Sequence, residues 1–259
     1  MAGSTRRLAL VTGASSGIGA DLARELAKDG HDVVLSARTV PAMEALAAEL
    51  ERGGAKSIII PADLARPGAA AELTASLEDR GLEVDVLVNN AGLGGVGRFD
   101  QMDPQRIDDM LMVNVVALTE LTRGLLPGMV ARRRGRVLLV ASTASFQPGP
   151  RMAAYFATKA YVLSLGEALA YELRGTGVTV TTLCPGATAT NFFKTAGANE
   201  IALQPAMSPS EVARIGYRAL TAGRRVAITG TLNRILALGG RYAPHSLTLP
   251  ATAALMSRR

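Results

Sequence analysis

The segment Arg7–Gly19, RLALVTGASSGIG, decides the fold of this 259-residue chain. Its first half is a short apolar run of the kind that forms a buried strand. Its second half carries three glycines in the spacing TGxxxGxG and leads into a helical pattern at Ile18, Leu22 and Leu26. A glycine-rich turn between a strand and a helix directs free backbone N–H groups toward a phosphate. The segment therefore predicts a nucleotide-binding unit at the start of an α/β domain.

Each glycine of this loop has its own predicted task. Gly13 permits the tight turn, Gly17 permits close approach of a ligand, and Gly19 lets the helix pack against the strand. A plain flexible turn is the alternative, but a strand and a helix flank the loop in the correct order.

The remainder of the chain alternates between apolar runs and helical patterns. Strands are predicted at residues 32–37, 57–61, 85–89, 136–141 and 178–184, and helices at 43–50, 69–77, 104–129 and 153–173. Continuous apolar runs separated by helices indicate a parallel sheet that is covered on both faces. No linker interrupts the pattern, so residues 1–259 are predicted to form a single three-layer α/β/α domain.

A second informative segment is Val140–Val162, VASTASFQPGPRMAAYFATKAYV. Tyr155 and Lys159 stand four residues apart, so on a helix they share one face. An ammonium group one turn away is expected to lower the pKa of the phenol, which can then pass a proton to or from an oxygen. Ser142 can donate a hydrogen bond to the same oxygen. Taken alone, the three residues also fit a core tyrosine, a surface lysine and a loop serine.

Five motifs in a fixed order carry a family resemblance. They are TGASSGIG, Asn89-Asn90-Ala91-Gly92, Ser142, Tyr155-Phe-Ala-Thr-Lys159 and Pro185-Gly186. With them the chain closely resembles the single-domain branch of the short-chain dehydrogenase/reductase family, roughly over residues 5 to 225. The resemblance implies a doubly wound, Rossmann-type parallel sheet, a nicotinamide cofactor, and reversible hydride transfer between an alcohol and a carbonyl group.

The resemblance also implies roles for four residues. Tyr155 is the general acid and base, Lys159 lowers its pKa and holds the nicotinamide ribose, and Ser142 hydrogen-bonds the reacting oxygen. Asn114, within MLMVNVVAL, is implied to bend its helix and to hold a water that extends a proton relay from Lys159. The other interpretation of Asn114 is a buried amide whose hydrogen bonds are satisfied in the core.

The predicted cofactor site combines the turns after five of the six predicted strands with two residues of the helix at 153–173. Its members are Gly13, Ser15, Ser16, Gly17, Ile18, Gly19, Arg38, Asp63, Leu64, Asn90, Ala91, Gly92, Tyr155, Lys159, Pro185, Gly186, Thr188 and Thr190. By resemblance Asp63 meets the adenine amino group and Leu64 packs beside the ring, although Asp63 also fits an N-cap of the next helix. Asn90 can tie neighbouring strands together.

Arg38 decides the predicted choice between the two nicotinamide cofactors. The second strand ends in Leu35-Ser36-Ala37-Arg38 and has no carboxylate at its tip to bind the ribose hydroxyls of NAD. A guanidinium there can form paired bonds to a 2′-phosphate, so NADP(H) is predicted to be preferred over NAD(H). A solvated surface arginine is the alternative. Ser16 stands where many NADPH-binding relatives carry a second basic residue.

The segment at about 187–223 lies where the family carries a mobile substrate-covering segment. It contains the apolar residues Phe192, Phe193, Ile201, Leu203 and Met207. These favour a hydrophobic substrate, but they equally fit side chains that pack the covering segment itself.

Charge is placed unevenly along the chain. The net charge is +6, yet the residues from Val212 onward include eight arginines and no Asp or Glu. The basic extension at about 224–259 also shows helical apolar patterns, so it fits an anionic membrane surface, an acidic acyl carrier or an ordinary solvated face. No nucleic-acid-binding motif accompanies this charge.

Few residues suit other chemistries. Cys184 is the single cysteine, which excludes an internal disulfide and fits a reducing compartment. His31 and His245 are isolated, so no metal site is predicted. With no signal peptide and no run of about 18 apolar residues, the protein is predicted to be cytoplasmic, with peripheral membrane association left open. By resemblance it forms a homo-oligomer, a dimer or a tetramer.

These observations predict an NADPH-dependent carbonyl reductase or alcohol dehydrogenase whose small-molecule substrate is a ketone, an aldehyde or a secondary alcohol. Two alternatives stay open. One is a reductase of carrier-bound or membrane-associated 3-oxoacyl or lipid substrates. The other is a non-catalytic NADP(H)-binding regulator, although such a protein would not need Ser142, Tyr155 and Lys159 together.

Overall fold

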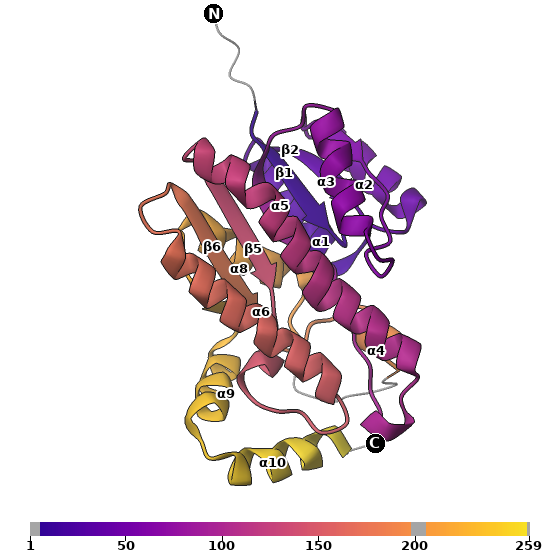
Figure 1. Cartoon of the computed structure of the whole chain (residues 1–259), viewed down its shortest axis with the longest axis vertical. Helices are drawn as coiled ribbons and strands as arrows, with labels where there is room; N and C mark the ends of the chain where they lie inside the picture. Colours follow the sequence, from indigo (N-terminus) through magenta and orange to yellow (C-terminus); the bar gives the residue numbers. More distant parts are fainter. Residues whose placement is uncertain (1–5, 198–205, 258–259) are drawn as a thin grey trace, which may run out of the picture.

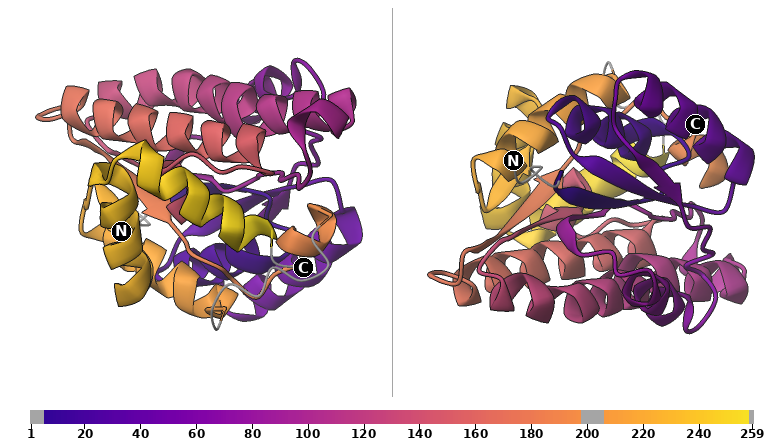
Figure 2. Two further views of the ribbon diagram at one scale, coloured as in Figure 1. Left: turned by 90° about the horizontal axis from the view of Figure 1, so that it is seen from below. Right: turned by 90° about the horizontal axis from the view of Figure 1, so that it is seen from above.

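A seven-stranded parallel sheet forms the centre of the protein. The computed structural model describes residues 6–197 and 206–257. The strands are β1 (Leu8–Thr12), β2 (Asp32–Ser36), β3 (Ser57–Ile59), β4 (Val84–Asn89), β5 (Gly135–Val140), β6 (Val178–Cys184) and β7 (Val226–Ile228), in the order β3-β2-β1-β4-β5-β6-β7. Helices cover both faces of this sheet (Figures 1 and 2). The predicted three-layer, Rossmann-type architecture is confirmed.

The two helical layers bury opposite sides of each strand. One layer holds α1 (Gly17–Lys28), α2 (Val40–Arg52) and α8 (Pro209–Thr221), and the other holds α3 (Ala69–Asp79), α4 (Pro104–Leu111), α5 (Leu118–Ala131) and α6 (Ala153–Glu172). In β1, Leu10 packs toward α3 and α5, whereas Val11 packs toward α1 and α2. Successive side chains of a strand point to opposite faces, and helices cover both faces here. Every residue of β1 is therefore buried.

The strand order reverses beside β1, and this creates a crevice at the carboxyl ends of β1 and β4. The Asn90 amide closes the base of the crevice, because its Nδ2 donates to the carbonyls of Thr12 at 2.9 Å and Gly13 at 3.2 Å. The backbone N–H groups of Asn90 and Ala91 in turn donate to Thr12 Oγ1, each at 3.1 Å. The prediction that an Asn side chain ties these strands is confirmed.

The C-terminal third differs most from its prediction. The sequence pattern predicts six strands, but the three residues of β7 form a seventh beside β6. The predicted covering segment of about 187–223 also includes α8, which instead packs on α1 and buries Val212, Ala213 and Leu220 against the sheet. Only the part before Pro209 can therefore lie near the site. Three residues are too short for a periodicity, and the partner of an amphipathic helix is set by the tertiary fold.

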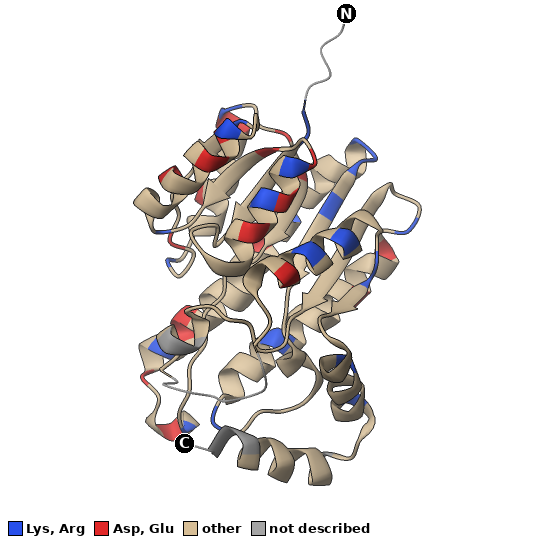
Figure 3. Cartoon of the chain, turned by 180° about the vertical axis from the view of Figure 1, so that it is seen from behind, with Lys and Arg blue, Asp and Glu red and all other residues tan. Residues whose placement is uncertain are grey.

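Three further helices lie beyond the carboxyl ends of the strands (Figure 1). They are α7 (Phe192–Thr195), α9 (Thr231–Tyr242) and α10 (His245–Ser257). In the part of the chain described, α9 carries arginines but no acidic residue (Figure 3).

One helical run, Pro104–Ala131, has the length and the mean hydropathy, 1.2, of a membrane span. Its residues Val113, Ala117, Leu118 and Leu121 are buried in the core against the sheet. This packing is that of a core helix of the α/β fold.

Candidate active site

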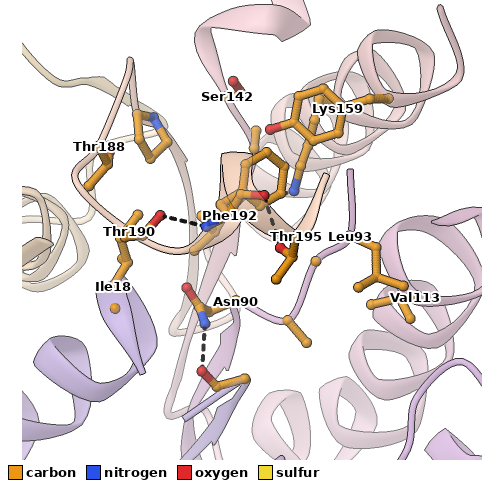
Figure 4. Close-up of a pocket in the computed structure, with 18 of the residues that line it drawn as sticks. Ile18, Asn90, Leu93, Val113, Ser142, Lys159, Thr188, Thr190, Phe192 and Thr195 are labelled. Atoms are coloured by element: carbon orange, nitrogen blue, oxygen red, sulfur yellow. Dashed lines mark hydrogen bonds between the residues drawn. The ribbon is translucent and has the colours of Figure 1, made fainter. Parts of the chain in front are cut away.

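A cavity of about 750 Å³ opens at the carboxyl ends of the strands (Figure 4). The glycine loop, the turns after β2, β3, β4, β5 and β6, and α6 and α9 all contribute to its walls. Every residue predicted for catalysis or cofactor binding lines this cavity except Gly19 and Asn114. Gly19 and Asn114 instead contact residues that line the cavity.

The glycine loop has the geometry of a phosphate cradle. Gly13 has φ +64° and Gly17 has φ +57°, values that favour glycine. Ser16 occupies the N-cap position of α1 with no capping hydrogen bond from its side chain, and the first turn has no acidic residue. The N-terminus of α1 therefore presents free N–H groups and a positive dipole to the cavity, which suits a dinucleotide pyrophosphate.

Gly19 supports the loop by its missing side chain. A Cβ atom on Gly19 would lie 2.4 Å from both the Gly13 oxygen and Asn90 Nδ2. The predicted close packing of helix on strand is confirmed, and it explains why Gly19 does not reach the cavity.

The adenosine end of the cavity holds Arg38, Asp63 and Leu64. Arg38 is exposed and makes no ion pair with any residue in the described ranges. Asp63 is not the N-cap of α3, because that helix begins at Ala69 after Gly68; its carboxylate instead accepts from the Ala65 N–H at 3.2 Å. The alternative interpretation of Asp63 is therefore wrong.

Tyr155, Lys159 and Ser142 line the other end of the cavity. Figure 4 labels Ser142 and Lys159 there. Tyr155 and Lys159 are buried on α6, and Ser142 directly follows Ala141 beyond the end of β5. The Lys159 ammonium donates to the Val140 carbonyl at 2.8 Å and lies 5.9 Å from the centre of the Tyr155 ring. The Ser142 hydroxyl accepts from the Ala144 N–H at 3.1 Å. One helix turn and one strand end thus place a phenol, an ammonium and a hydroxyl around one space.

Burial dominates the ionisation of this group. It raises the pKa of the Tyr155 phenol to about 12, and hydrogen bonding with Ser142 lowers that pKa by less. Burial also lowers the pKa of the Lys159 ammonium to about 8. The predicted lowering of the pKa of Tyr155 by Lys159 is therefore wrong for the protein alone, because Lys159 directs its ammonium to the Val140 carbonyl. Tyr155 accordingly keeps its proton at neutral pH and is ready to donate it.

The shifted pKa of Lys159 predicts a pH-dependent stability. Between about pH 8 and 10.5 the unfolded chain binds the Lys159 proton and the folded chain does not, so stability rises with pH through this window. We expect Lys159→Met to remove roughly 3 kcal/mol of this rise, since 1.4 kcal/mol corresponds to one pKa unit. Urea unfolding of both proteins from pH 7 to 10.5 measures the difference.

Comparison with the parent removes most contributions other than that of Lys159. Burial raises the pKa of Cys184 and of Tyr155 to about 12, which lowers stability as pH rises in both proteins. In the parent the Lys159 ammonium also lowers the pKa of Cys184 by a smaller amount, so this contribution is part of the measured difference. The matched control is Lys56→Met, which replaces an exposed lysine and should leave the parent's pH profile unchanged. Identical profiles for Lys159→Met and the parent would contradict the argument.

Asn114 fits the interpretation as a satisfied buried amide. Its Oδ1 accepts from the Leu93 N–H at 2.8 Å, and its Nδ2 donates to the Leu93 carbonyl at 2.8 Å and to Thr158 Oγ1 at 3.0 Å. The chain takes a π-helical form here, Met112–Ala117, between α4 and α5. Asn114 therefore ties the turn after β4 to α6. Its implied role in a proton relay stays a prediction.

The turn after β6 is built largely from its own hydrogen bonds. Thr188 Oγ1 donates to the Gly186 carbonyl at 3.0 Å, and Thr190 Oγ1 accepts from the Phe192 N–H at 3.3 Å. The Thr143 N–H donates to the Pro185 carbonyl at 2.8 Å, which fixes this turn beside Ser142.

The substrate side of the cavity combines Phe192, which the sequence pattern placed in the covering segment, with Gly94 and Arg106, which it did not single out. The Phe192 ring lies 5.2 Å from the Tyr155 ring, and a Cβ on Gly94 would meet it at 2.6 Å. Arg106 of α4 donates to the carbonyls of Gly94, at 2.8 Å from Nε, and Thr195, at 2.7 Å. These contacts hold α7 against the turn after β4.

Two sets of residues complete the description of this side. Further wall residues are Leu93, Val113, Met152, Phe156, Asn233, Leu236 and Ala237. No motif marks them, because ordinary amphipathic helices carry such residues everywhere. Of the predicted covering residues, Ile201 and Leu203 lie outside the described part of the chain, as does the side chain of Phe193.

Comparison with known proteins agrees with this geometry. The sequence model of the short chain dehydrogenase family matches residues 7–201. A short-chain dehydrogenase from Sphingobium yanoikuyae, solved in complex with NADPH, is 34% identical, with a TM-score of 0.82 over 90% of this chain and 92% of that chain. The bulky-bulky ketone specific alcohol dehydrogenase from Comamonas testosteroni is 30% identical, with a TM-score of 0.78 over 98% and 95%. Ketoacyl reductase HetN from Nostoc sp. is 35% identical over 182 residues, 70% of this chain and 63% of its own length.

The family match and the structural similarity thus extend along most of the chain. The protein belongs to the short-chain dehydrogenase family and is an oxidoreductase that acts on CH–OH and C=O groups.

Proposed function

We propose that this protein is an NADP(H)-dependent carbonyl reductase that acts on hydrophobic ketones or aldehydes, and in reverse on secondary alcohols. The observation that carries the proposal is one continuous cavity, which joins the phosphate cradle and Arg38 at one end to Ser142, Tyr155 and Lys159 at the other. A dinucleotide fits this cavity because the cradle is open and Arg38 is free of ion pairs with the residues described.

The mechanism assigns one task to each side chain. A nicotinamide held in this cavity would supply the hydride for the carbonyl carbon. The Tyr155 phenol donates its proton to the carbonyl oxygen, and the Ser142 hydroxyl donates a hydrogen bond to that oxygen. The Lys159 ammonium beneath them stabilises the phenolate that remains and would hold the ribose hydroxyls. Hydride and proton together convert the ketone to the alcohol.

The preference for a hydrophobic substrate rests on the wall beside Tyr155. Phe192, Met152 and Phe156 form an apolar surface there. The similarity to the bulky-bulky ketone specific alcohol dehydrogenase from Comamonas testosteroni also favours a bulky ketone as substrate. A panel of ketones, aldehydes, quinones and 3-oxoacyl thioesters, followed by NADPH oxidation, tests this part. Faster turnover of small hydrophilic carbonyls than of aryl or cyclic ketones would contradict it.

A second candidate is a reductase of 3-oxoacyl groups on a carrier or a membrane. The likeness to a ketoacyl reductase and the arginine-rich C-terminus favour it. Higher kcat/KM for 3-oxoacyl thioesters than for free ketones in the same panel would favour this candidate. NADPH binding without turnover on any substrate would instead favour the non-catalytic regulator.

We further propose that the protein is cytoplasmic, in keeping with its one buried, unpaired cysteine. We also propose that it forms a homo-oligomer, a dimer or a tetramer.

Arg38 tests the cofactor choice. A guanidinium forms charge-assisted hydrogen bonds with a phosphate, each worth about 1.5–3 kcal/mol, and solvent exposure brings the total toward the lower end. Because 1.4 kcal/mol corresponds to a factor of ten, we expect NADPH to bind at least about tenfold more tightly than NADH. Arg38→Ala should remove most of this difference by weakening NADPH alone. Fluorescence titration of both cofactors measures it.

Two further variants sharpen this experiment. Ala37→Asp combined with Arg38→Ala should invert the preference, because a carboxylate accepts from a ribose hydroxyl and repels a phosphate. Arg52→Ala removes an exposed arginine of α2 outside the cavity and serves as the matched control. Equal affinities in the parent, or an unchanged ratio in Arg38→Ala, would show that Arg38 is only a surface residue.

A further inference from the structure

Large apolar side chains are exposed along α9 and α10. Eleven large hydrophobic residues are exposed in the described ranges, and seven of them fall between residues 232 and 249. They are Leu232, Ile235, Leu236, Leu238, Tyr242, Leu247 and Leu249, and the exposed fraction reaches 77% at Tyr242. We call these seven residues, with Arg234 and Arg241, the C-terminal surface. So many exposed large side chains in one segment mark an interaction surface.

The orientation of α9 is the reverse of an ordinary amphipathic helix. Ile235, Leu238 and Tyr242 are spaced i, i+3 and i+7, the spacing of a face that normally packs into a core, yet all three are exposed. The inward face instead carries Ala237 and Gly240, both buried. The helix can lie this way because its inward residues are small: a Cβ on Gly240 would lie 2.6 Å from Gln147 Oε1.

Positive charge borders this apolar row. Arg234 and Arg241 are seven residues apart and therefore lie along one edge of α9. Arg234 makes no ion pair within the described ranges, whereas Arg241 and Arg225 both approach Glu167, at 3.4 and 3.8 Å. One carboxylate cannot neutralise two guanidinium groups, and no acidic residue occurs after Glu211. The edge of the C-terminal surface thus stays positive (Figure 3).

We propose that the C-terminal surface docks on an anionic lipid bilayer. The apolar side chains of α9 and α10 enter the boundary between headgroups and acyl chains, and the arginines contact the lipid phosphates. Docking does not depend on the proposed reductase function. Because Asn233, Leu236 and Ala237 of α9 also line the cavity, it would bring the cavity wall next to the bilayer.

Charge argues against the other occupants. A second copy related by a twofold axis would present the same apolar and basic side chains, with no acidic residue of this segment to pair the arginines. An acidic carrier protein would pair the arginines but would also have to cover the exposed leucine, isoleucine and tyrosine side chains. A bilayer supplies both an apolar interior and anionic headgroups.

Vesicle binding by the full-length protein tests the proposal. We expect sedimentation with phosphatidylcholine vesicles that contain one third phosphatidylserine, and at least about tenfold weaker binding to phosphatidylcholine alone or at high salt. Arg234→Gln with Arg241→Gln, and separately Ile235→Gln with Leu238→Gln, should each reduce binding about tenfold. The matched control, Tyr171→Gln with Arg174→Gln, replaces an exposed aromatic–arginine pair at the C-terminal end of α6 and should bind as the parent does.

A spectroscopic measurement reports insertion without any loss-of-function variant. The chain contains no tryptophan, so Tyr242→Trp and the control Tyr171→Trp each introduce a single reporter. We expect the emission of the first to shift to shorter wavelength on anionic vesicles and that of the second to stay unchanged. Absence of parent binding at low salt, or equal spectra for both reporters, would overturn the proposal. So would self-association through the C-terminal surface, lost in Ile235→Gln with Leu238→Gln, or binding to an acidic acyl carrier protein, in place of vesicle binding.

Discussion

Tyr155→Phe is expected to lower turnover by about 10³-fold, a value within the usual contribution of a positioned acid or base. The change removes the proton donor but keeps the ring that packs against Phe156 and Phe192. Cofactor affinity and melting temperature should therefore change little. NADPH oxidation with any substrate that the parent accepts measures turnover, and NADPH fluorescence measures binding.

The same helix offers a matched control. Tyr171→Phe removes an exposed phenol on α6, and its ring lies against Arg174, far from the cavity lining. Full activity is expected for this variant. Substantial residual turnover in Tyr155→Phe would show that another group delivers the proton and would remove the mechanism proposed above.

Gly19→Ala is expected to lower both stability and cofactor affinity, although it adds only one methyl group. The new Cβ would lie 2.4 Å from the Gly13 carbonyl oxygen. It would lie equally close to Asn90 Nδ2. Neither atom can move away easily, because Gly13 has φ +64° and the Asn90 amide is hydrogen-bonded to the carbonyls of Thr12 and Gly13. We expect the free energy of unfolding to fall by roughly 2 kcal/mol, the cost of overpacking a tight contact.

The glycine loop must also move to accept the methyl group, so dinucleotide affinity should fall at least about tenfold, equivalent to 1.4 kcal/mol. Gly239→Ala is the matched control, because it too lies in a helix but its Cβ would meet no atom within 4 Å. That variant should be unchanged or more stable by about 0.5–1 kcal/mol. Denaturant unfolding and NADPH titration of both variants decide the question, and equal results for the two would contradict it.

Local sequence patterns account for much of the candidate site. The glycine spacing after β1 works through backbone angles and contacts within a few residues, so TGxxxGxG predicts the cradle directly. Tyr155 and Lys159 share a helix face for the same local reason. The continuous apolar runs likewise predict a parallel sheet, because strands covered on both faces have no solvent side.

The tertiary structure decided what these patterns could not. Burial raises the pKa of Tyr155. The Lys159 ammonium, which was expected to lower that pKa, donates a hydrogen bond to the Val140 carbonyl instead. Electrostatic effects depend on desolvation and on distant partners, neither of which is written in a spacing of four residues.

The fold class, the cradle, the residues at the strand ends and the uneven charge can all be predicted from local patterns in the chain. Only the tertiary structure placed α8 on the sheet, added β7, brought Arg106 to the turn after β4 and turned the apolar face of α9 outward. The difference arises from the distance along the chain over which each effect operates. Dihedral preferences and periodicity act over one helical turn or one strand, whereas the partner of an amphipathic surface depends on which segments the whole chain brings beside it.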